Sequence, residues 1–112
     1  MKLIYLATPY STPDPARRAF RFNAACAVAY KALKHGAAVY APIVSWHQVK
    51  LMFDLKGDWE EWKDLDKEMI SRCDELWVVK INGWEKSKGI KNEIELAQAF
   101  GKPVKYLRPE EL

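Results

Sequence analysis

The chain alternates between short, continuous apolar runs and longer segments in which apolar residues recur every three or four positions. The clearest runs are 3–7 (LIYLA) and 76–79 (LWVV), and residues 37–41 and 103–107 have similar compositions. Short apolar runs bounded by turn residues are typical of buried strands. The pattern therefore predicts strands at 3–7, 37–41, 75–80 and 103–107.

A long helix is predicted between the first two strands. Asp14 can cap its first turn, and Pro15 suits the first helical position. Gly36 is placed to end the helix. One apolar stripe runs along it and is expected to face the core: Phe22, Cys26, Ala29, Tyr30 and Leu33.

Two further helices are predicted later in the chain. The first starts at Asp58, which with Glu61 matches a capping box, and it ends near Arg72. The second starts at Ser87 and ends at Gly101. Its buried face is expected to carry Ile90, Ile94 and Ala97.

The remaining segment, 43–57, has no clear period and is expected to hold a loop with a short helix.

Strands and helices then alternate along the chain, which is typical of a single α/β domain, here 1–112, with a parallel sheet between helices. Ligands of such sheets bind beyond the carboxyl ends of the strands. Three separate stretches should meet there: 8–11, 42–47 and 87–93.

Composition narrows the class of protein. The 112 residues are 49% apolar and 29% charged, which is enough apolar material for one core. The net charge of +3 is too small to indicate a nucleic-acid polymer as partner. It suits a small anionic ligand, or it serves solubility alone.

No apolar run approaches the roughly 20 residues of a membrane span, so no membrane partner is expected. The two cysteines, Cys26 and Cys73, lack metal-like spacing. The first residues enter a strand pattern without a signal-peptide cleavage site. We therefore expect a cytoplasmic protein with reduced thiols.

The strongest functional signal is the stretch 87–93 (SKGIKNE). A helix that starts directly after a strand leaves unpaired N–H groups, where anionic groups bind. Ser87 and Gly89 would form this cradle, and a glycine lets a phosphate approach the backbone. Glu93 follows, where the helix dipole favours an ionised carboxylate that can attack the anomeric carbon of a sugar. An ordinary capping serine and a solvated glutamate are the alternatives.

Other polar residues can contribute to the same edge. Asp66 is a poor helix former in a predicted helix and is a candidate acid. Tyr5 could orient Glu93, or it is a core tyrosine with a satisfied hydroxyl. One of three arginines at the start of the first predicted helix could reach a phosphate, with Arg21 the candidate, or all three are solvated: Arg17, Arg18 and Arg21. His47 could touch a base or a sugar.

Together these motifs resemble the nucleoside 2-deoxyribosyltransferase superfamily, which includes 2′-deoxynucleoside 5′-phosphate N-hydrolases. Their order and spacing carry the resemblance over roughly residues 2–107. The family fold is flavodoxin-like, a three-layer sandwich with four to five parallel strands. The motif Asn82-Gly83-Trp84 is similar to one in a small bacterial and phage branch of this superfamily. The motifs are Tyr5-Leu6-Ala7 before a Pro/Ser loop, Asp66 eight positions before Asp74, Ser87-x-Gly89-x-x-x-Glu93, and Asn82-Gly83-Trp84.

The resemblance implies a role for each matched residue. Glu93 matches the glutamate nucleophile that forms a glycosyl-enzyme intermediate. Asp66 matches the aspartate that assists the departing base, and Tyr5 matches the tyrosine that orients the glutamate. The reaction needs no metal and no organic cofactor.

The match at Ser87 bears on the substrate. The transferases carry an aspartate there for the sugar 5′-hydroxyl, whereas the phosphohydrolases carry a serine, because a carboxylate would repel a 5′-phosphate. The serine thus favours a nucleoside 5′-monophosphate, with the Gly89 N–H and Ser11 assisting.

We therefore expect an N-glycosidase that cleaves the base–sugar bond of a nucleoside or nucleoside 5′-monophosphate, by hydrolysis or by transfer to another base. The alternative is a module that binds or senses a nucleotide without cleaving it. Relatives assemble as dimers or tetramers, so a homo-oligomer is expected. Trp59 and Trp62 share one helix face and are a candidate contact surface, although they could instead stack a base.

Overall fold

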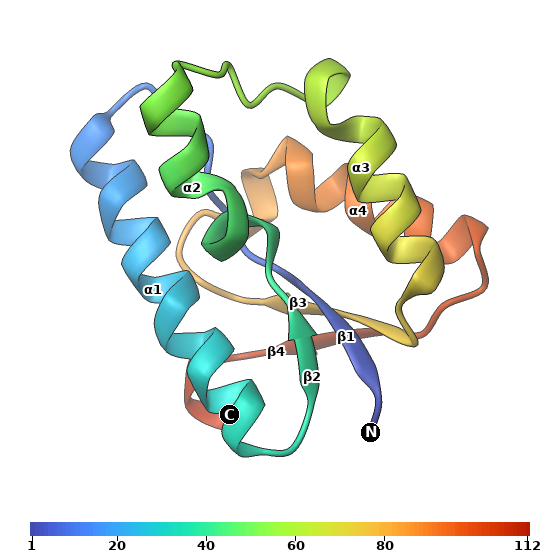
Figure 1. Ribbon diagram of the computed structural model, residues 1–112. Coiled ribbons are helices and arrows are strands. Elements are labelled where there is room, and N and C mark those ends of the chain that lie inside the picture. The colour runs from blue at the N-terminus through green and yellow to red at the C-terminus, as the bar shows by residue number, and fades with distance from the viewer.

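Four parallel strands form the central sheet, in the spatial order β2-β1-β3-β4. The structure is a computed structural model that describes all 112 residues. The chain leaves β1 for β2 on one side and then crosses to β3 on the other, so the topological switch point lies between β1 and β3. The predicted α/β fold with a flavodoxin-like parallel sheet is confirmed (Figure 1). The strands are β1 (Leu3–Ala7), β2 (Ala38–Tyr40), β3 (Glu75–Val79) and β4 (Val104–Leu107).

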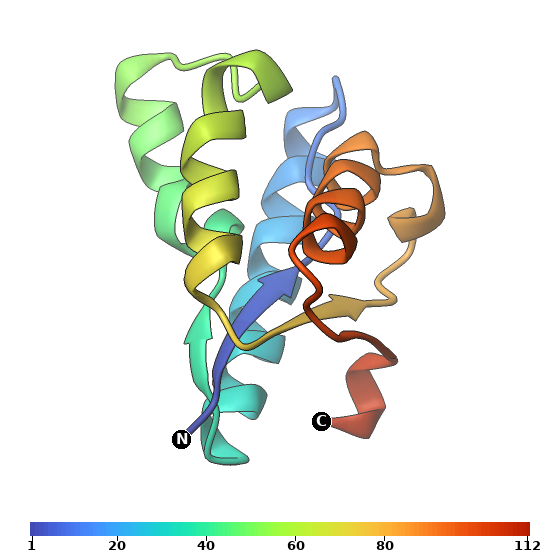
Figure 2. The same ribbon diagram turned by 90° about the vertical axis from the view of Figure 1, so that its right-hand side faces the viewer.

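The sheet lies between α1 on one side and α3 with α4 on the other (Figures 1 and 2). The helix α2 follows β2 directly and packs against α1. None of the four α-helices is both long enough and apolar enough to cross a membrane. The α-helices are α1 (Pro15–Lys34), α2 (Pro42–Phe53), α3 (Trp59–Arg72) and α4 (Lys88–Ala99), and two short 3-10 helices are η1 (Trp84–Lys86) and η2 (Pro109–Glu111).

Successive side chains of β1 enter two different cores, as the alternation of a strand requires. Tyr5 belongs to the core under α3 and α4, whereas Leu6 belongs to the core under α1. The first core also contains Ile70, Leu76, Val78, Ile90 and Ala97. The second also contains Val28, Ala41, Val79 and Ile81. This alternation sends the Tyr5 hydroxyl toward α4, which carries Glu93.

The predicted helix starts are confirmed. The side chains of Asp14, Asp58 and Ser87 each accept a hydrogen bond from a backbone N–H of the first turn. The capping box is only half formed, because Glu61 donates its N–H to Asp58 but its side chain does not return a bond.

The predicted buried stripe on α1 is only partly confirmed. Phe22, Cys26 and Ala29 are half-buried, and Ala29 packs against the core, but the prediction was wrong for the last two residues. Tyr30 and Leu33 are 62% and 57% exposed, and the residues turned toward the sheet are smaller. The buried residues of α1 are Ala25, Val28 and Ala32. Small side chains let the helix axis approach the sheet closely, so packing selected the face with the smallest residues rather than the largest ones.

The segment 43–57, which was expected to hold a loop with a short helix, holds a longer helix followed by a short loop. Residues Pro42–Phe53 form the three-turn helix α2, with Pro42 in its first turn. The expected start signal is missing, because the capping position is Ala41 and makes no side-chain bond. Apolar residues occur on most sides of this helix, so it has no clear period.

Candidate active site

A cleft of about 1270 Å³ opens beyond the carboxyl ends of β1 and β3. Its walls are formed by the loop after β1, the start of α1, α2, α3, and the turn that leads from β3 into α4. The three stretches that the sequence assigned to this edge, 8–11, 42–47 and 87–93, all contribute lining residues. The parallel-sheet rule therefore located the cleft correctly.

Glu93 lies in this cleft with its carboxyl group held by Tyr5. The Glu93 side chain is only 7% exposed, and the Tyr5 hydroxyl donates a hydrogen bond of 2.5 Å to its Oε2. Tyr5 itself is completely buried, and its ring lies 5.4 Å from that of Tyr40 between centroids. The tyrosine is thus fixed by the core, and it fixes the direction of the carboxyl group.

The electrostatics of Glu93 differ from the prediction. Burial, with a smaller contribution from the charge of Asp66, raises the pKa of Glu93 to about 8, against the opposing effects of Tyr5 and Lys50. The helix dipole was expected to favour the ionised form. Glu93 is the sixth residue of α4, however, and the dipole acts mainly within the first turn.

Asp66 joins Glu93 in the cleft from the facing helix α3. Burial raises the pKa of Asp66, whereas the Tyr5 hydroxyl and the charge of Lys50 lower it. The Tyr5 hydroxyl therefore acts to lower the pKa of both carboxyl groups. Two carboxyl groups with raised pKa values in a cleft are typical of acid–base and nucleophilic chemistry.

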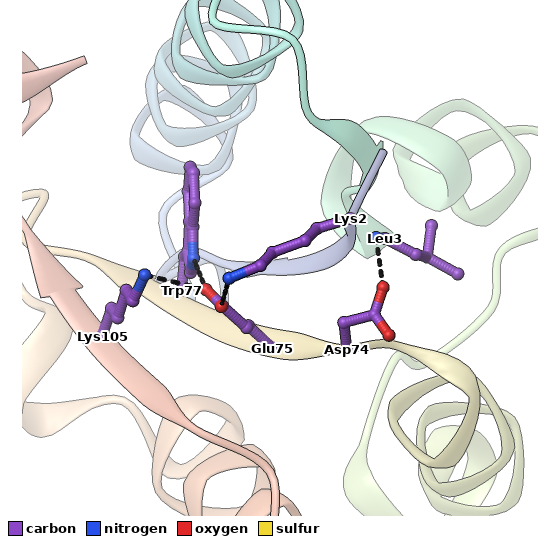
Figure 3. A network of polar contacts seen from close by, with 6 residues as sticks. All are labelled: Lys2, Leu3, Asp74, Glu75, Trp77 and Lys105. Carbon is purple, nitrogen blue, oxygen red and sulfur yellow. Dashed lines mark hydrogen bonds and ion pairs between the residues drawn. The ribbon is translucent and has the colours of Figure 1, made fainter.

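The neighbouring aspartates do not take part. Asp64 is exposed outside the cleft. Asp74 lies at the amino end of the sheet, where its Oδ2 accepts a 2.7 Å hydrogen bond from the backbone N–H of Leu3 (Figure 3). Of the acidic residues around 64–75, Asp66 is the one that the fold brings to the cleft.

The start of α4 forms an electropositive part of the cleft. Ser87 Oγ accepts a 3.2 Å bond from the Ile90 N–H, and the first-turn N–H groups of Lys88 and Gly89 have no partner within the helix. The first turn contains no acidic residue. A Cβ on Gly89 would meet nothing closer than Ser87 Oγ at 3.8 Å, so the space beside Gly89 is open.

Arg21 lines the cleft but is partly occupied by the backbone. Its Nη1 donates to the carbonyl oxygens of Ser11, at 3.0 Å, and Tyr10. Its Nη2 lies so close to Gly83 that a Cβ there would be 2.5 Å away, and Gly83 also has a φ of +97°. Arg21 therefore braces the loop after β1 against the turn after β3, and Ser11 lies exposed at the rim.

His47 is not brought to the cleft. It is buried, its Nδ1 is 2.7 Å from the Tyr10 hydroxyl, and its ring stacks on Phe22 at 4.0 Å between centroids. Burial lowers the pKa of His47, and the charges of Lys50 and Arg18 add to this effect. His47 holds the Tyr10 hydroxyl from outside the cleft, so it does not lie where it could contact a base or a sugar.

Sequence reasoning missed Lys50 and Trp46, which both line the cleft from α2. The Lys50 Nζ lies 5.0 Å from the centroid of the Tyr10 ring and 4.7 Å from that of the Trp62 ring. The available signal was the spacing of Ile43, Trp46 and Lys50, which a helix from Pro42 places on one face. The segment was interpreted as a loop with a short helix of unknown bounds, so this spacing was not used.

Three tryptophans line the cleft. Trp59 and Trp62, which the sequence offered as a subunit surface or a stacking surface, line the cleft together with Trp46. The Trp46 and Trp62 rings are 5.3 Å apart between centroids, and the Trp62 Nε1 is buried without a hydrogen-bond partner. These rings provide flat apolar faces of the kind that hold a nucleobase.

A second buried glutamate lies at the opposite end of the sheet (Figure 3). Glu75 accepts bonds from Lys2 Nζ at 2.5 Å and Trp77 Nε1 at 2.9 Å, and Lys105 Nζ lies 3.1 Å away. These partners, with Lys2 the largest cause, lower the pKa of Glu75 to about 2. The cluster ties β1, β3 and β4 together.

No group of three or more His, Cys, Asp or Glu side chains is arranged to hold a metal ion.

A comparison with curated proteins finds none that matches the chain. A family model described as "Domain of unknown function (DUF1937)" matches residues 2–108, which is nearly the whole chain. The chain therefore belongs to the DUF1937 family.

Proposed function

We propose that this protein is an N-glycosidase that cleaves the base–sugar bond of a nucleoside or a nucleoside 5′-monophosphate, with Glu93 as nucleophile. The observation that carries the proposal is the buried Glu93 carboxyl group, held at 2.5 Å by the Tyr5 hydroxyl in a cleft that also contains Asp66. The resemblance to the nucleoside 2-deoxyribosyltransferase superfamily supports the same assignment. The proposal includes a cytoplasmic location, where such substrates occur.

The parts of the cleft match the parts of a nucleotide. The first turn of α4, with Ser87 and Gly89, suits a phosphate. Arg17, Lys86 and Lys88 add positive charge along the lining. The tryptophan faces suit a base, and Glu93 would then lie beside the sugar between them. This arrangement favours a 5′-monophosphate over a nucleoside.

In the proposed mechanism Glu93 attacks C1′ of the sugar while the C1′–N bond breaks and its electron pair leaves with the base. Asp66, in its protonated form, donates a proton to the base nitrogen. Water then attacks C1′ of the glycosyl ester, Asp66 takes up its proton, and the Glu93 carboxylate is released. Two inversions give retention at C1′. A second base in place of water would complete a transfer.

The pKa of Glu93 sets the working pH of this mechanism. The nucleophile must be ionised, and the raised pKa of about 8 leaves most Glu93 protonated at neutral pH in the free protein. Because the same step needs a protonated Asp66, we expect the rate to pass through a maximum and to fall again above about pH 8. The Tyr5 hydrogen bond favours the ionised form and keeps it accessible.

The test is a panel of ribo- and deoxyribonucleoside 5′-monophosphates and the corresponding nucleosides, with free base measured by chromatography. Glu93→Gln serves as the inactive reference. Release of base by the wild-type protein alone supports the proposal. Absence of base from every compound contradicts it.

One observation favours a second candidate function, a module that binds a nucleotide without cleaving it. A Glu93 that is largely protonated at neutral pH can donate a hydrogen bond to a ligand instead of attacking it. Calorimetric titration separates the two. Tight binding of an intact nucleotide, with no base released over the same period, favours the module.

The expected homo-oligomer, a dimer or a tetramer, is part of the proposal. Trp59 and Trp62 line the cleft, but other apolar side chains are exposed at the end of α2: Leu51, Met52 and Phe53. An exposed apolar cluster of this kind favours contact with a second copy. Light scattering on a size-exclusion column tests it, and a monomer at high concentration would contradict it.

A further inference from the structure

Lys50 is a half-buried cation inside the cleft that makes no ion pair and no hydrogen bond. Its ammonium group lies between two aromatic rings, 5.0 Å from the centroid of Tyr10 and 4.7 Å from that of Trp62. Such contacts hold a cation in place but do not neutralise it. The ammonium group could therefore donate a hydrogen bond to an oxygen or nitrogen acceptor of a ligand.

The position of Lys50 is supported from the other side by Gly57. A Cβ on Gly57 would lie 3.2 Å from the Lys50 Nζ and 3.4 Å from its Cδ and Cε, and Gly57 has a φ of +71°. The loop between α2 and α3 therefore passes directly against the lysine side chain. Both the conformation and the contact favour glycine there.

The other cations of the cleft are arranged differently. Arg21 donates to two backbone carbonyl oxygens, and Lys86 and Lys88 are exposed. Burial lowers the pKa of Lys50, and the charges of Asp66, Glu61 and Glu93 oppose this effect. Its ammonium group therefore lies in the same field as the proposed reacting groups.

The neighbours of Lys50 place it at the tryptophan part of the cleft. Trp62, under the ammonium group, precedes Asp66 by four residues on α3 and so lies one turn away on the same face. A base bound beside these rings would present its edge atoms to Lys50 and Asp66 together.

We propose that Lys50 is a further catalytic residue, which donates a hydrogen bond to a carbonyl oxygen or ring nitrogen of the departing base. The inference rests on the proposed function. As the C1′–N bond breaks, its electron pair moves into the base ring and negative charge develops on the acceptor atom. Lys50 keeps its proton and stabilises that charge. The base nitrogen receives its proton from Asp66, and C1′ bonds to Glu93.

The experiment compares Lys50→Met with the wild-type protein on two substrates of different leaving ability. Methionine retains the apolar stem but removes the charge. The substrates are the nucleotide cleaved fastest in the panel and its ring-fluorinated analogue, 5-fluoro for a pyrimidine or 2-fluoro for a purine. Fluorine makes the base a better leaving group, so it needs less help from a donor.

We expect Lys50→Met to lower kcat by about 100-fold on the parent nucleotide, as removal of a donor to a developing negative charge does, and by about tenfold or less on the fluorinated one. Lys50→Arg should recover part of the loss. The matched control is Lys80→Met, because Lys80 also lies over a tryptophan, 5.8 Å from the Trp84 ring centroid, but outside the cleft. That control should leave both rates unchanged.

Equal losses on the two substrates, or no loss, would overturn the role of Lys50 while leaving the glycosidase proposal intact. Failure of the wild-type protein to cleave any nucleotide would overturn the proposed function itself, and a catalytic Lys50 with it. Thermal unfolding checks that each variant folds. If Lys50→Met does not fold, Lys50→Gln is compared on the same two substrates.

Discussion

Glu93 and Glu75 occupy opposite ends of one sheet, and each is almost fully buried, at 7% and 4% exposed. Their electrostatics are opposite. Glu75 has two lysines and an indole N–H as partners, and its pKa falls to about 2. Glu93 has one hydroxyl partner, which does not offset its burial, and burial together with the charge of Asp66 raises its pKa to about 8.

The comparison teaches that burial alone does not mark a reactive carboxyl group. The partners decide: a carboxylate whose lone pairs are all used by cations and donors is structural, and one with a single donor can still change its protonation state or attack a substrate. The first four of the five predictions below test this difference.

The largest effect is expected from Glu93→Gln. Removing the nucleophile should lower kcat by at least about 1000-fold. The matched control is Glu95→Gln, because Glu95 is exposed on the same helix and outside the cleft, and its activity should stay within about twofold. Steady-state rates at saturating nucleotide measure both. Equal rates for the two variants would remove Glu93 from the chemistry.

Glu93→Gln should also remove a pH-dependent contribution to the free energy of unfolding. Because the folded-state pKa of Glu93 lies above its ordinary value of 4.5, its contribution is most favourable below pH 4.5 and is lost as pH rises toward 8. The free energy of unfolding of the wild-type protein should therefore fall between pH 5 and 8 relative to that of Glu93→Gln. Denaturant titrations at several pH values measure this, and parallel curves would contradict the raised pKa.

The next largest effect is expected from Tyr5→Phe. Loss of the hydroxyl removes the one group that donates to Glu93, so the pKa of Glu93 should rise further. We expect kcat to fall by about 10- to 100-fold at pH 7, with the pH–rate profile displaced to higher pH. Tyr40→Phe is a control for the neighbouring ring. An unchanged profile in Tyr5→Phe would mean that Tyr5 serves packing alone.

Glu75→Gln should affect stability rather than activity. Breaking the contacts with Lys2, Trp77 and Lys105 should lower the free energy of unfolding by about 2 kcal/mol at pH 7, allowing for the exposure of both lysines. The depressed pKa means that the difference from wild type shrinks as pH falls from 4.5 toward 2. Denaturant unfolding measures it. A large loss of kcat with normal stability would invert the roles of the two glutamates.

The smallest effect is expected from Gly89→Ala. The added Cβ meets only Ser87 Oγ at 3.8 Å, so the fold accommodates it, and alanine favours the helix by up to about 1 kcal/mol. A phosphate held at the start of α4 would be displaced. Calorimetry should give a Kd for the nucleoside monophosphate several-fold weaker and an unchanged Kd for the nucleoside. Equal changes for both ligands would place the phosphate elsewhere.

The sequence predicted the sheet, three of the four α-helices and the edge at which the cleft lies. These features depend on local signals: apolar runs for the strands, and capping side chains at Asp14, Asp58 and Ser87. The prediction that Tyr5 could orient Glu93 rested on its place in the first strand and on the resemblance, and the hydrogen bond between the two side chains is confirmed.

The features that sequence reasoning missed depend on tertiary packing. The helix α2 begins without a polar cap, so the shared face of Trp46 and Lys50 was not visible. The raised pKa of Glu93 results from burial by distant segments, whereas the local dipole indicated an ionised group. His47 follows β2 as predicted, but stacking on Phe22 turns it into the core.

The most direct test of the central claim is to trap the glycosyl-enzyme. A nucleotide with fluorine at C2′ in the arabino configuration slows breakdown of the ester, so mass spectrometry of the intact protein and its peptides can locate the adduct. We expect one fluorinated sugar phosphate per chain, attached to the peptide at Glu93 and absent in Glu93→Gln. Base release with no adduct, or with the adduct on another residue, would contradict it.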